Sequence, residues 1–233
     1  RQGIAPEYQA EANRIAGESL YRIDQPSEAI PYLKKYVAAT DDPAQSAMYI
    51  LGLSQYHEGR YAEAISSLQP VSTLDDAMGQ SSLLYIGQAL LNQGDTNAAL
   101  LSLDKALRMN HDKAVQESAF YNYAVAKFRG GRIPFGSSVA TFEEFLRRYP
   151  DSRYAPEVQE YVVSGWINDN NYEGALESIN RMRNPGEKVL KAKQQVLYVL
   201  GSRALATGNA DAALNYLSQG TSLDRYDRGV ALQ

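Results

Sequence analysis

The sequence predicts an all-α fold, a solenoid of about six helix–turn–helix repeats. Three observations predict it. A segment of 35 to 39 residues recurs along the chain, turn-forming residues fall near the middle of most copies, and hydrophobic residues recur at spacings of three and four. Strict alternation of hydrophobic and polar residues, which is typical of strands, is nearly absent. We therefore expect about twelve helices and no sheet.

The repeat is clearest in the segments 51–68, 86–103 and 200–217. Each has an aliphatic residue before a glycine, a second glycine seven residues later, an alanine five further on and a leucine four beyond that. Weaker copies at 17–33 and 163–179, and a longer one at 124–142, complete a series. The predicted repeats are 10–43, 45–78, 80–113, 117–152, 156–189 and 194–227.

Each repeat is expected to hold two helices that approach closely. The turn between them is marked by the pairs Gly59-Arg60, Gly94-Asp95, Asn170-Asn171 and Gly208-Asn209. Pro26 suits the first turn of a second helix, where its missing N–H costs nothing. The predicted close-packing positions of the first helices are Gly52, Gly87, Ala124 and Gly201, and those of the second helices are Ala29, Ala64, Ala99, Ser138, Ala175 and Ala213.

These features resemble the tetratricopeptide repeat (TPR), with its W-x₂-L-G-x₂-Y…A-x₃-F…P pattern. The L-G step appears as Leu51-Gly52, Ile86-Gly87 and Leu200-Gly201, and Pro150 takes the place of the closing proline. The A-x₃-F step appears with an aliphatic residue in place of the phenylalanine, as in Ala64 and Leu68. The resemblance implies a right-handed α–α superhelix formed by residues 1–233 as a single TPR solenoid.

One stretch has a narrower resemblance. Residues 142–155 read FEEFLRRYPDSRYA and are similar to tetratricopeptide proteins of bacterial cell envelopes, such as the barrel-assembly lipoproteins and the Tol-associated periplasmic coordinator. This resemblance implies a periplasmic or envelope-associated protein that acts in envelope assembly or maintenance. The alternative location is the cytoplasm.

Composition narrows the function classes. The 233 residues carry a net charge of −4, which offers no basic footprint for a nucleic-acid backbone. A helical-repeat RNA binder, which repeats of this length also fit, is therefore disfavoured. The chain has no cysteine, and no apolar run approaches the roughly 18 residues of a membrane span.

No pattern of catalytic or metal-binding residues stands out. The only histidines, His57 and His111, lack any paired-ligand spacing. Ser102 and Lys105 match S-x-x-K, but the companion motifs of the penicillin-recognising enzymes are missing. The segment 131–138 has the outline of a phosphate loop without its lysine. We expect no enzyme activity, no cofactor and no metal.

The resemblance implies that ligands lie against one stripe of the first helices, facing the concave groove. Aromatic and arginine side chains, which protein-binding surfaces favour, occur on that stripe. We therefore expect a scaffold that binds a protein or peptide through Arg14, Tyr21, Arg22, Tyr49, Tyr56, His57, Gln88, Asn92, Tyr121, Phe128, Arg129 and Tyr198. Chaperone-tail-binding domains of this family hold a terminal carboxylate with Lys and Asn at positions five and nine of the first helix. That clamp is absent, because position nine holds residues such as Glu18, Leu53 and Gln88. Packing of some of these rings between repeats is the competing interpretation.

The end of the sequence suggests an alternative, a self-assembling structural module. The sixth repeat ends near Asp227, and the six residues that follow are too few for a capping helix. Leu214 and Leu217 would then lie on a second helix without a neighbour. We expect the chain to be part of a longer array, or to self-associate through its uncapped C-terminal repeat.

Overall fold

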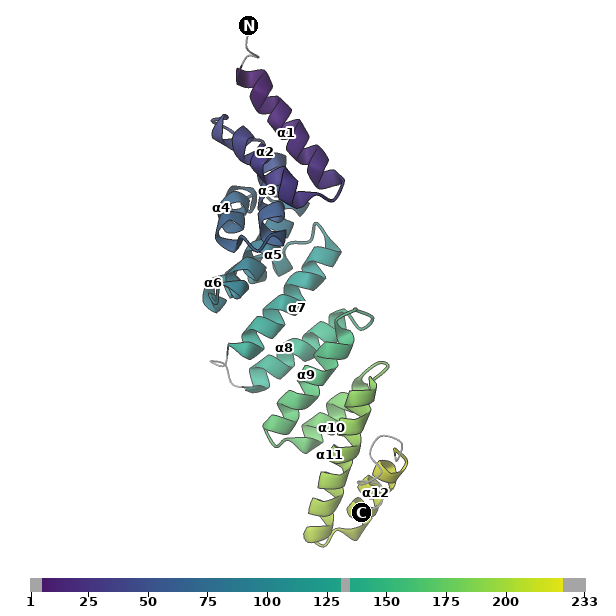
Figure 1. Cartoon of the computed structure of the whole chain (residues 1–233). Helices are drawn as coiled ribbons and strands as arrows, with labels where there is room; N and C mark the ends of the chain where they lie inside the picture. The colour runs from purple at the N-terminus through teal and green to yellow at the C-terminus, as the bar shows by residue number, and fades with distance from the viewer. Residues whose placement is uncertain (1–5, 131–134, 224–233) are drawn as a thin grey trace. The chain divides into compact units, whose positions relative to one another are not determined.

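The computed structural model describes residues 6–130 and 135–223, and these form twelve helices joined by short turns (Figure 1). No strand occurs in these two ranges. The predicted all-α fold is therefore confirmed for the described part of the chain. The helices fall into two compact units, residues 1–126 and 127–233, with α7 (Lys113–Arg129) running across the division.

The first unit holds three helix pairs ahead of α7. They are α1 (Pro6–Arg22) with α2 (Pro26–Ala38), α3 (Gln45–His57) with α4 (Tyr61–Val71), and α5 (Ala77–Asn92) with α6 (Thr96–Arg108). The second helix of a pair also packs against the first helix of the next, as α2 does on α3 and α4 on α5. Each pair thus buries an apolar face that it could not bury alone.

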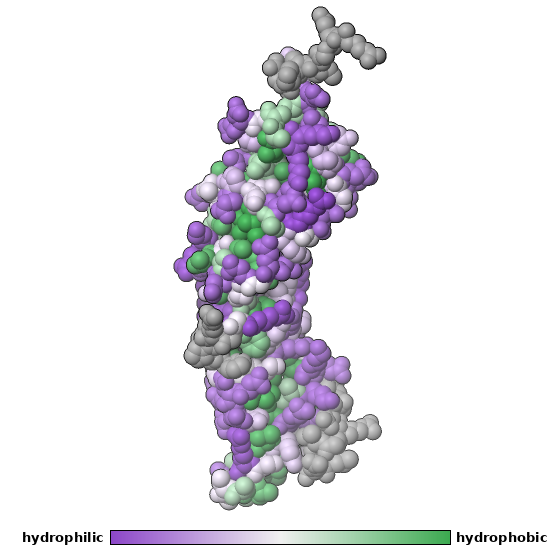
Figure 2. Space-filling model, turned by 60° about the vertical axis from the view of Figure 1, so that its left-hand side comes forward, coloured by the Kyte–Doolittle hydropathy of each residue, from purple (hydrophilic) through white to green (hydrophobic). Residues whose placement is uncertain are grey.

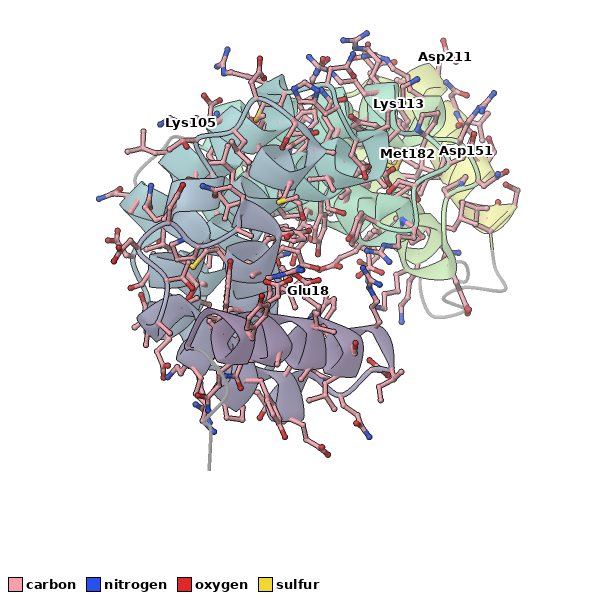
Figure 3. The ribbon with its side chains drawn as sticks, turned by 90° about the horizontal axis from the view of Figure 1, so that it is seen from above. Glu18, Lys105, Lys113, Asp151, Met182 and Asp211 are labelled. Atoms are coloured by element: carbon pink, nitrogen blue, oxygen red, sulfur yellow. The ribbon has the colours of Figure 1, made fainter. Side chains whose placement is uncertain are left out.

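The first helices form the inner layer of this unit. Helix α3 contacts both α1 and α5, whereas α4 contacts neither α2 nor α6 within the described residues. Because the first helices approach one another and the second helices do not, the surface made by α1, α3 and α5 is the concave one. Figure 3 shows Glu18, on α1, on this inner side and Lys105, on α6, at the outer edge.

The second unit continues with the same kind of packing. Its helices are α8 (Phe135–Arg148), α9 (Ala155–Asn168), α10 (Tyr172–Arg181), α11 (Glu187–Ala206) and α12 (Ala210–Thr221). Neighbours along the chain pack on one another from α8 to α12, and the first helices α9 and α11 also touch. On the face drawn in Figure 2, hydrophobic residues reach the surface in patches that hydrophilic side chains flank.

The turn within a repeat has a constant geometry. Two residues before α4, α6 and α12 the chain passes through positive φ at Gly59 (71°), Gly94 (83°) and Gly208 (78°). Asp24 (61°) and Asn170 (55°) hold the same place before α2 and α10. Glycine adopts this conformation without a steric penalty, and Asp and Asn tolerate it better than other residues. The two weaker copies of the repeat therefore keep the turn without its glycine.

The predicted close contacts of the second helices are confirmed. All six small residues expected there are buried, with no more than 3% of the surface of any of them exposed. Leu33, Leu68 and Leu103, each four residues further on, are completely buried. The four-residue spacing of this pattern thus fixes which side of each second helix faces its partner.

Candidate functional site

Four tyrosines from three different helices gather on the inner layer of the first unit. Tyr21 comes from α1, Tyr49 and Tyr56 from α3, and Tyr85 from α5. The ring centroids of Tyr56 and Tyr85 lie 4.9 Å apart in an edge-to-face arrangement, and the Tyr49 hydroxyl donates to Ser81 Oγ at 2.8 Å. All four rings are partly exposed. We call this set the tyrosine row.

The tyrosine row keeps hydroxyl groups available to a ligand. Within the described residues, the hydroxyls of Tyr21, Tyr56 and Tyr85 form no hydrogen bond with the protein. Burial raises the pKa of each of these three phenols, and in Tyr21 the neighbouring Tyr49 and Tyr85 raise it further. The row is therefore a surface of neutral aromatic rings with three donor and acceptor groups.

Of the predicted polar residues near this surface, His57 contacts the tyrosine row, and Arg14 and Arg22 lie with Tyr21 on α1. His57 lies edge-on to Tyr56, with ring centroids 5.7 Å apart, and is exposed. Arg14 donates to Glu18 at 2.7 Å and also pairs with Glu11, and these hydrogen bonds hold the pKa of its guanidinium above the usual range. Arg22 is exposed and forms no ion pair within the described residues.

The remaining predicted positions of the first unit divide between surface and core. Gln88 is partly exposed, Asn92 is exposed and donates to the backbone carbonyl of Gln88, and Tyr121 is partly exposed on α7. The aliphatic residues of the same stripe are buried: Leu53, Leu84 and Val125 expose 5%, 6% and 9% of their surface. They pack between helices, whereas Leu91 of the same stripe is partly exposed. The accessible part of the stripe is therefore mainly aromatic and polar.

A second aromatic cluster lies in the second unit. The centroid of the Phe128 ring is 5.6 Å from that of Phe142 and 5.3 Å from that of Tyr161, and Tyr161 stacks on Phe142 at 5.0 Å. Arg129 donates to the Tyr161 hydroxyl at 3.4 Å, and that hydroxyl donates to Glu157 at 2.9 Å. Phe142 is completely buried, so this cluster serves the core as well as the surface. Tyr198, on α11, is partly exposed.

The prediction of groove residues missed Tyr85 and Tyr161, which the structure brings into the two clusters. Tyr85 lies one residue after Leu84, a position of the predicted stripe, whereas no groove residue was predicted on α9, the helix of Tyr161. Adjacent residues of a helix point about 100° apart, so the exposed inner surface is wider than one stripe. The neighbours of each stripe position are therefore candidates too, and Tyr85 is one of them.

The structure places the residues of the other motifs as follows. Ser102 donates to the backbone carbonyl of Ala98, and Lys105 is exposed on α6. His111 contacts Asp75, far along the chain from His57. In the segment 131–138, residues 131–134, Ile133 among them, lie outside the described residues.

Two searches of the described residues bear on metal sites and membrane spans. No group of three or more His, Cys, Asp or Glu side chains is placed to hold a metal ion. None of the described helices combines the length and the hydropathy needed to cross a bilayer.

Two protein families match the sequence. The tetratricopeptide repeat family matches residues 10–69, and the family described as outer membrane lipoprotein, YfiO, matches residues 41–165, just over half of the chain. No curated protein sequence matches significantly.

Three solved structures illustrate the similarity of this fold to known ones. The C-terminal part of a TPR repeat-containing protein from Cytophaga hutchinsonii is similar with a TM-score of 0.61 and 13% identity, over 91% of this chain and 79% of that one. YrrB, described as a TPR protein with an unusual peptide-binding site, is similar with a TM-score of 0.56 and 16% identity, over 70% and 79%. Pseudomonas aeruginosa pilF is similar with a TM-score of 0.51 and 16% identity, over 97% and 96%. At these identities the similarity shows the fold alone.

Proposed function

Since the chain belongs to the outer membrane lipoprotein (YfiO) family and is a tetratricopeptide-repeat protein, we propose that it is a non-enzymatic scaffold for a protein or peptide partner. The partner lies against α1, α3 and α5 of the first unit and contacts the tyrosine row.

The observation that carries this proposal is the tyrosine row itself. Tyrosine offers a large, rigid contact area at a low cost in side-chain entropy, and it is enriched in protein-binding surfaces. Three of the four hydroxyls have no hydrogen-bond partner within the described residues. A bound backbone presents N–H and C=O groups that these hydroxyls would satisfy, while apolar side chains of the partner would pack between the rings.

We also propose that the protein works in the bacterial cell envelope, in its assembly or maintenance. The family match over residues 41–165 supports this location. Fractionation of the native cells, followed by immunoblotting of envelope and cytoplasmic fractions, tests it directly. Recovery of the protein in the cytoplasmic fraction alone would contradict the proposal.

Affinity capture from native cells tests the binding function. The wild-type chain is compared with a Tyr56→Ala/Tyr85→Ala variant and with Tyr32→Ala, a control on the outer helix α2 where the ring is exposed. We expect a discrete partner to be captured by the wild type and the control but lost in the double variant. A Tyr56→Phe/Tyr85→Phe variant guards against unfolding, because it keeps the rings and removes only the hydroxyls. Equal capture by all variants would refute the tyrosine row as the binding surface.

Self-association is a second candidate, and exposed apolar residues at three helices favour it. Leu214 on α12 and Leu205 near the end of α11 expose 71% and 62% of their surface, and Ile15 and Ile23 expose 53% and 65% in and just after α1. In the interior of the array such faces pack on the neighbouring pair, as α4 does on α5. Light scattering should then report a mass that rises with concentration and falls back in Leu214→Glu. A monomer mass at every concentration would exclude this candidate.

A further inference from the structure

The second unit contains a cleft of about 550 Å³ beside its second helices α8 and α10. It lies between α8 and α10, and residues of α9 form its floor. Leu146, Val162 and Met182 supply apolar surface. Three arginines, Arg147, Arg181 and Arg183, outnumber the two lining glutamates, Glu143 and Glu144. None of these residues belongs to the tyrosine row or to the stripe predicted from the sequence.

A buried hydrogen-bond acceptor in this cleft has no partner. Gln159, which lines the cleft, exposes 4% of its surface. Its Nε2 donates to the backbone carbonyl of Arg183 at 2.9 Å, but its Oε1 accepts no hydrogen bond from the protein. A buried carbonyl without a hydrogen-bond donor destabilises the fold, so such a group needs a donor from elsewhere.

An equivalent glutamine in the first unit shows what is missing. Gln80, on α5, also donates to backbone carbonyls at the end of the following helix, α6, those of Ala106 and Met109. Its Oε1 accepts the backbone N–H groups of His111 and Asp112, the two residues just before α7.

The two residues just before α11 are Pro185 and Gly186. Proline has no N–H, so the sequence removes one of the donors that would satisfy Gln159. Gly186 keeps its N–H, but Gln159 Oε1 accepts no hydrogen bond from it, so the oxygen of this cleft-lining residue has no partner in the protein.

The arginines at the cleft can exchange their present partners. Arg147 pairs with Glu144 at 2.6 Å, Arg181 with Glu177, and Arg183 with Asp151 at 3.4 Å. Each of these arginine side chains is about 70% exposed, and ion pairs of this kind contribute little to stability and are screened by salt. A ligand carboxylate that buries part of a guanidinium can replace them. Charge also favours an anion in this unit: residues 127–233 carry 14 Lys and Arg against 12 Asp and Glu, whereas residues 1–126 carry 9 against 15.

We propose that this cleft binds an extended acidic peptide segment, at a second site separate from the tyrosine row. One backbone N–H of the segment donates to Gln159 Oε1. Its carboxylates pair with Arg147, Arg181 and Arg183, and its apolar side chains rest on Leu146, Val162 and Met182. An extended backbone leaves its N–H groups unpaired, which a helical ligand does not.

The chain carries its own reporter for this site. Trp166 is the only tryptophan, and its indole N–H donates to Ser178 Oγ at 2.9 Å and to Glu143 at 3.3 Å. Both acceptors line the cleft. Occupation of the cleft is therefore expected to change the fluorescence of Trp166.

The test titrates the full chain with an acetylated, amidated eight-residue peptide that alternates glutamate and valine, at low salt, and follows Trp166 fluorescence. The same peptide with lysine in place of glutamate is the ligand control. Arg147→Gln/Arg181→Gln is the test variant. Arg108→Gln is the matched protein control, because Arg108 is 72% exposed and pairs with Asp104 one turn away, but lies in the first unit.

We expect saturable binding of the glutamate peptide and no binding of the lysine peptide. In the double arginine variant the affinity for the glutamate peptide should be weaker by about fivefold or more, because two exposed charge contacts are lost. Binding to Arg108→Gln should equal that of the wild type. Three results would overturn the proposal: no saturable change at millimolar glutamate peptide, equal binding of the lysine peptide, or an unchanged affinity in the double variant. If no saturable change occurs, a water molecule and not a peptide would be the hydrogen-bond donor to Gln159 Oε1.

Discussion

A Cβ atom placed on Gly52 would lie 2.4 Å from Cγ of Leu68, closer than two carbon atoms that are not bonded to each other can approach. The first helix of this repeat therefore packs directly on the leucine of the second. The same contact recurs at similar distances in three other repeats, between Gly17 and Leu33, Gly87 and Leu103, and Gly201 and Leu217. This contact sets the spacing of the two helices in each of these pairs.

Gly52→Ala should destabilise the protein in spite of the better helix propensity of alanine. The added methyl group meets the branched end of Leu68, and overpacking of this kind costs about 1–3 kcal/mol. Gly220→Ala is the control, because its Cβ would meet only Leu197 Cβ at 3.7 Å. Urea denaturation should show a lower midpoint for the first variant and an equal or higher one for the second. The same midpoint shift in both would disprove the close contact.

Asp24→Gly should stabilise the protein by about 1 kcal/mol or less. Asp24 has a φ of 61° at the place where other repeats have glycine, and an L-residue pays a steric cost there. Asp24→Ala is the comparison variant, and it should lower the stability because alanine tolerates this conformation less well than aspartate. Thermal denaturation of the three chains measures the order. A glycine variant less stable than the wild type would show that the Asp24 side chain, not its backbone, matters at this turn.

The same turn shows why the fold was predictable. Three features of each repeat are local: the small residue, the leucine four positions later and the turn geometry. The sequence of each repeat is therefore enough to predict them. Even the weak copies kept enough of them: Ala29 and Leu33 are completely buried although Asp24 replaces the glycine of the turn.

The candidate sites depend on features that are not local. Whether Tyr85 or Leu84 reaches the inner surface follows from the rotation of α5 against α3, which no spacing within one repeat encodes. The unpaired oxygen of Gln159 depends on the turn at Pro185, 26 positions further along the chain. Such a relationship becomes visible only when Gln80 and Gln159 are compared in three dimensions.

The tyrosine row should make the protein less stable in alkali. Burial raises the pKa of Tyr21, Tyr56 and Tyr85 above 10.0, so from about pH 10 upward the unfolded chain releases protons that the folded chain still holds. Their contribution is complete below about pH 10 and is lost as pH rises through the folded-state pKa values. Urea denaturation at about pH 9 and about pH 11 should show a smaller loss in Tyr56→Phe/Tyr85→Phe than in the wild type. Tyr32→Phe, on an exposed ring, should lose as much as the wild type, and an equal loss in all three would contradict the burial of these phenols.

Helix α12 should open more easily than its counterpart α4. In α12 only Ala213 and Gly220 are buried, whereas α4 buries Ala64, Ser67, Leu68 and Val71. Hydrogen exchange follows local opening, which is easier where few apolar groups are buried. Mass spectrometry on the dilute chain should find faster exchange in residues 210–221 than in 61–71. Equal protection of the two helices in a proven monomer would count against an uncovered face on α12.

Site-specific photo-crosslinking in the native cells tests the proposed binding surface most directly. Benzoylphenylalanine replaces Tyr21 or Tyr85 on the inner layer, and Tyr32 or Leu101 on the outer helices, where both side chains are exposed. We expect irradiation to give a discrete covalent adduct from positions 21 and 85 and none from positions 32 and 101. Adducts from the outer positions alone, or of equal yield from all four, would contradict a partner held on the tyrosine row.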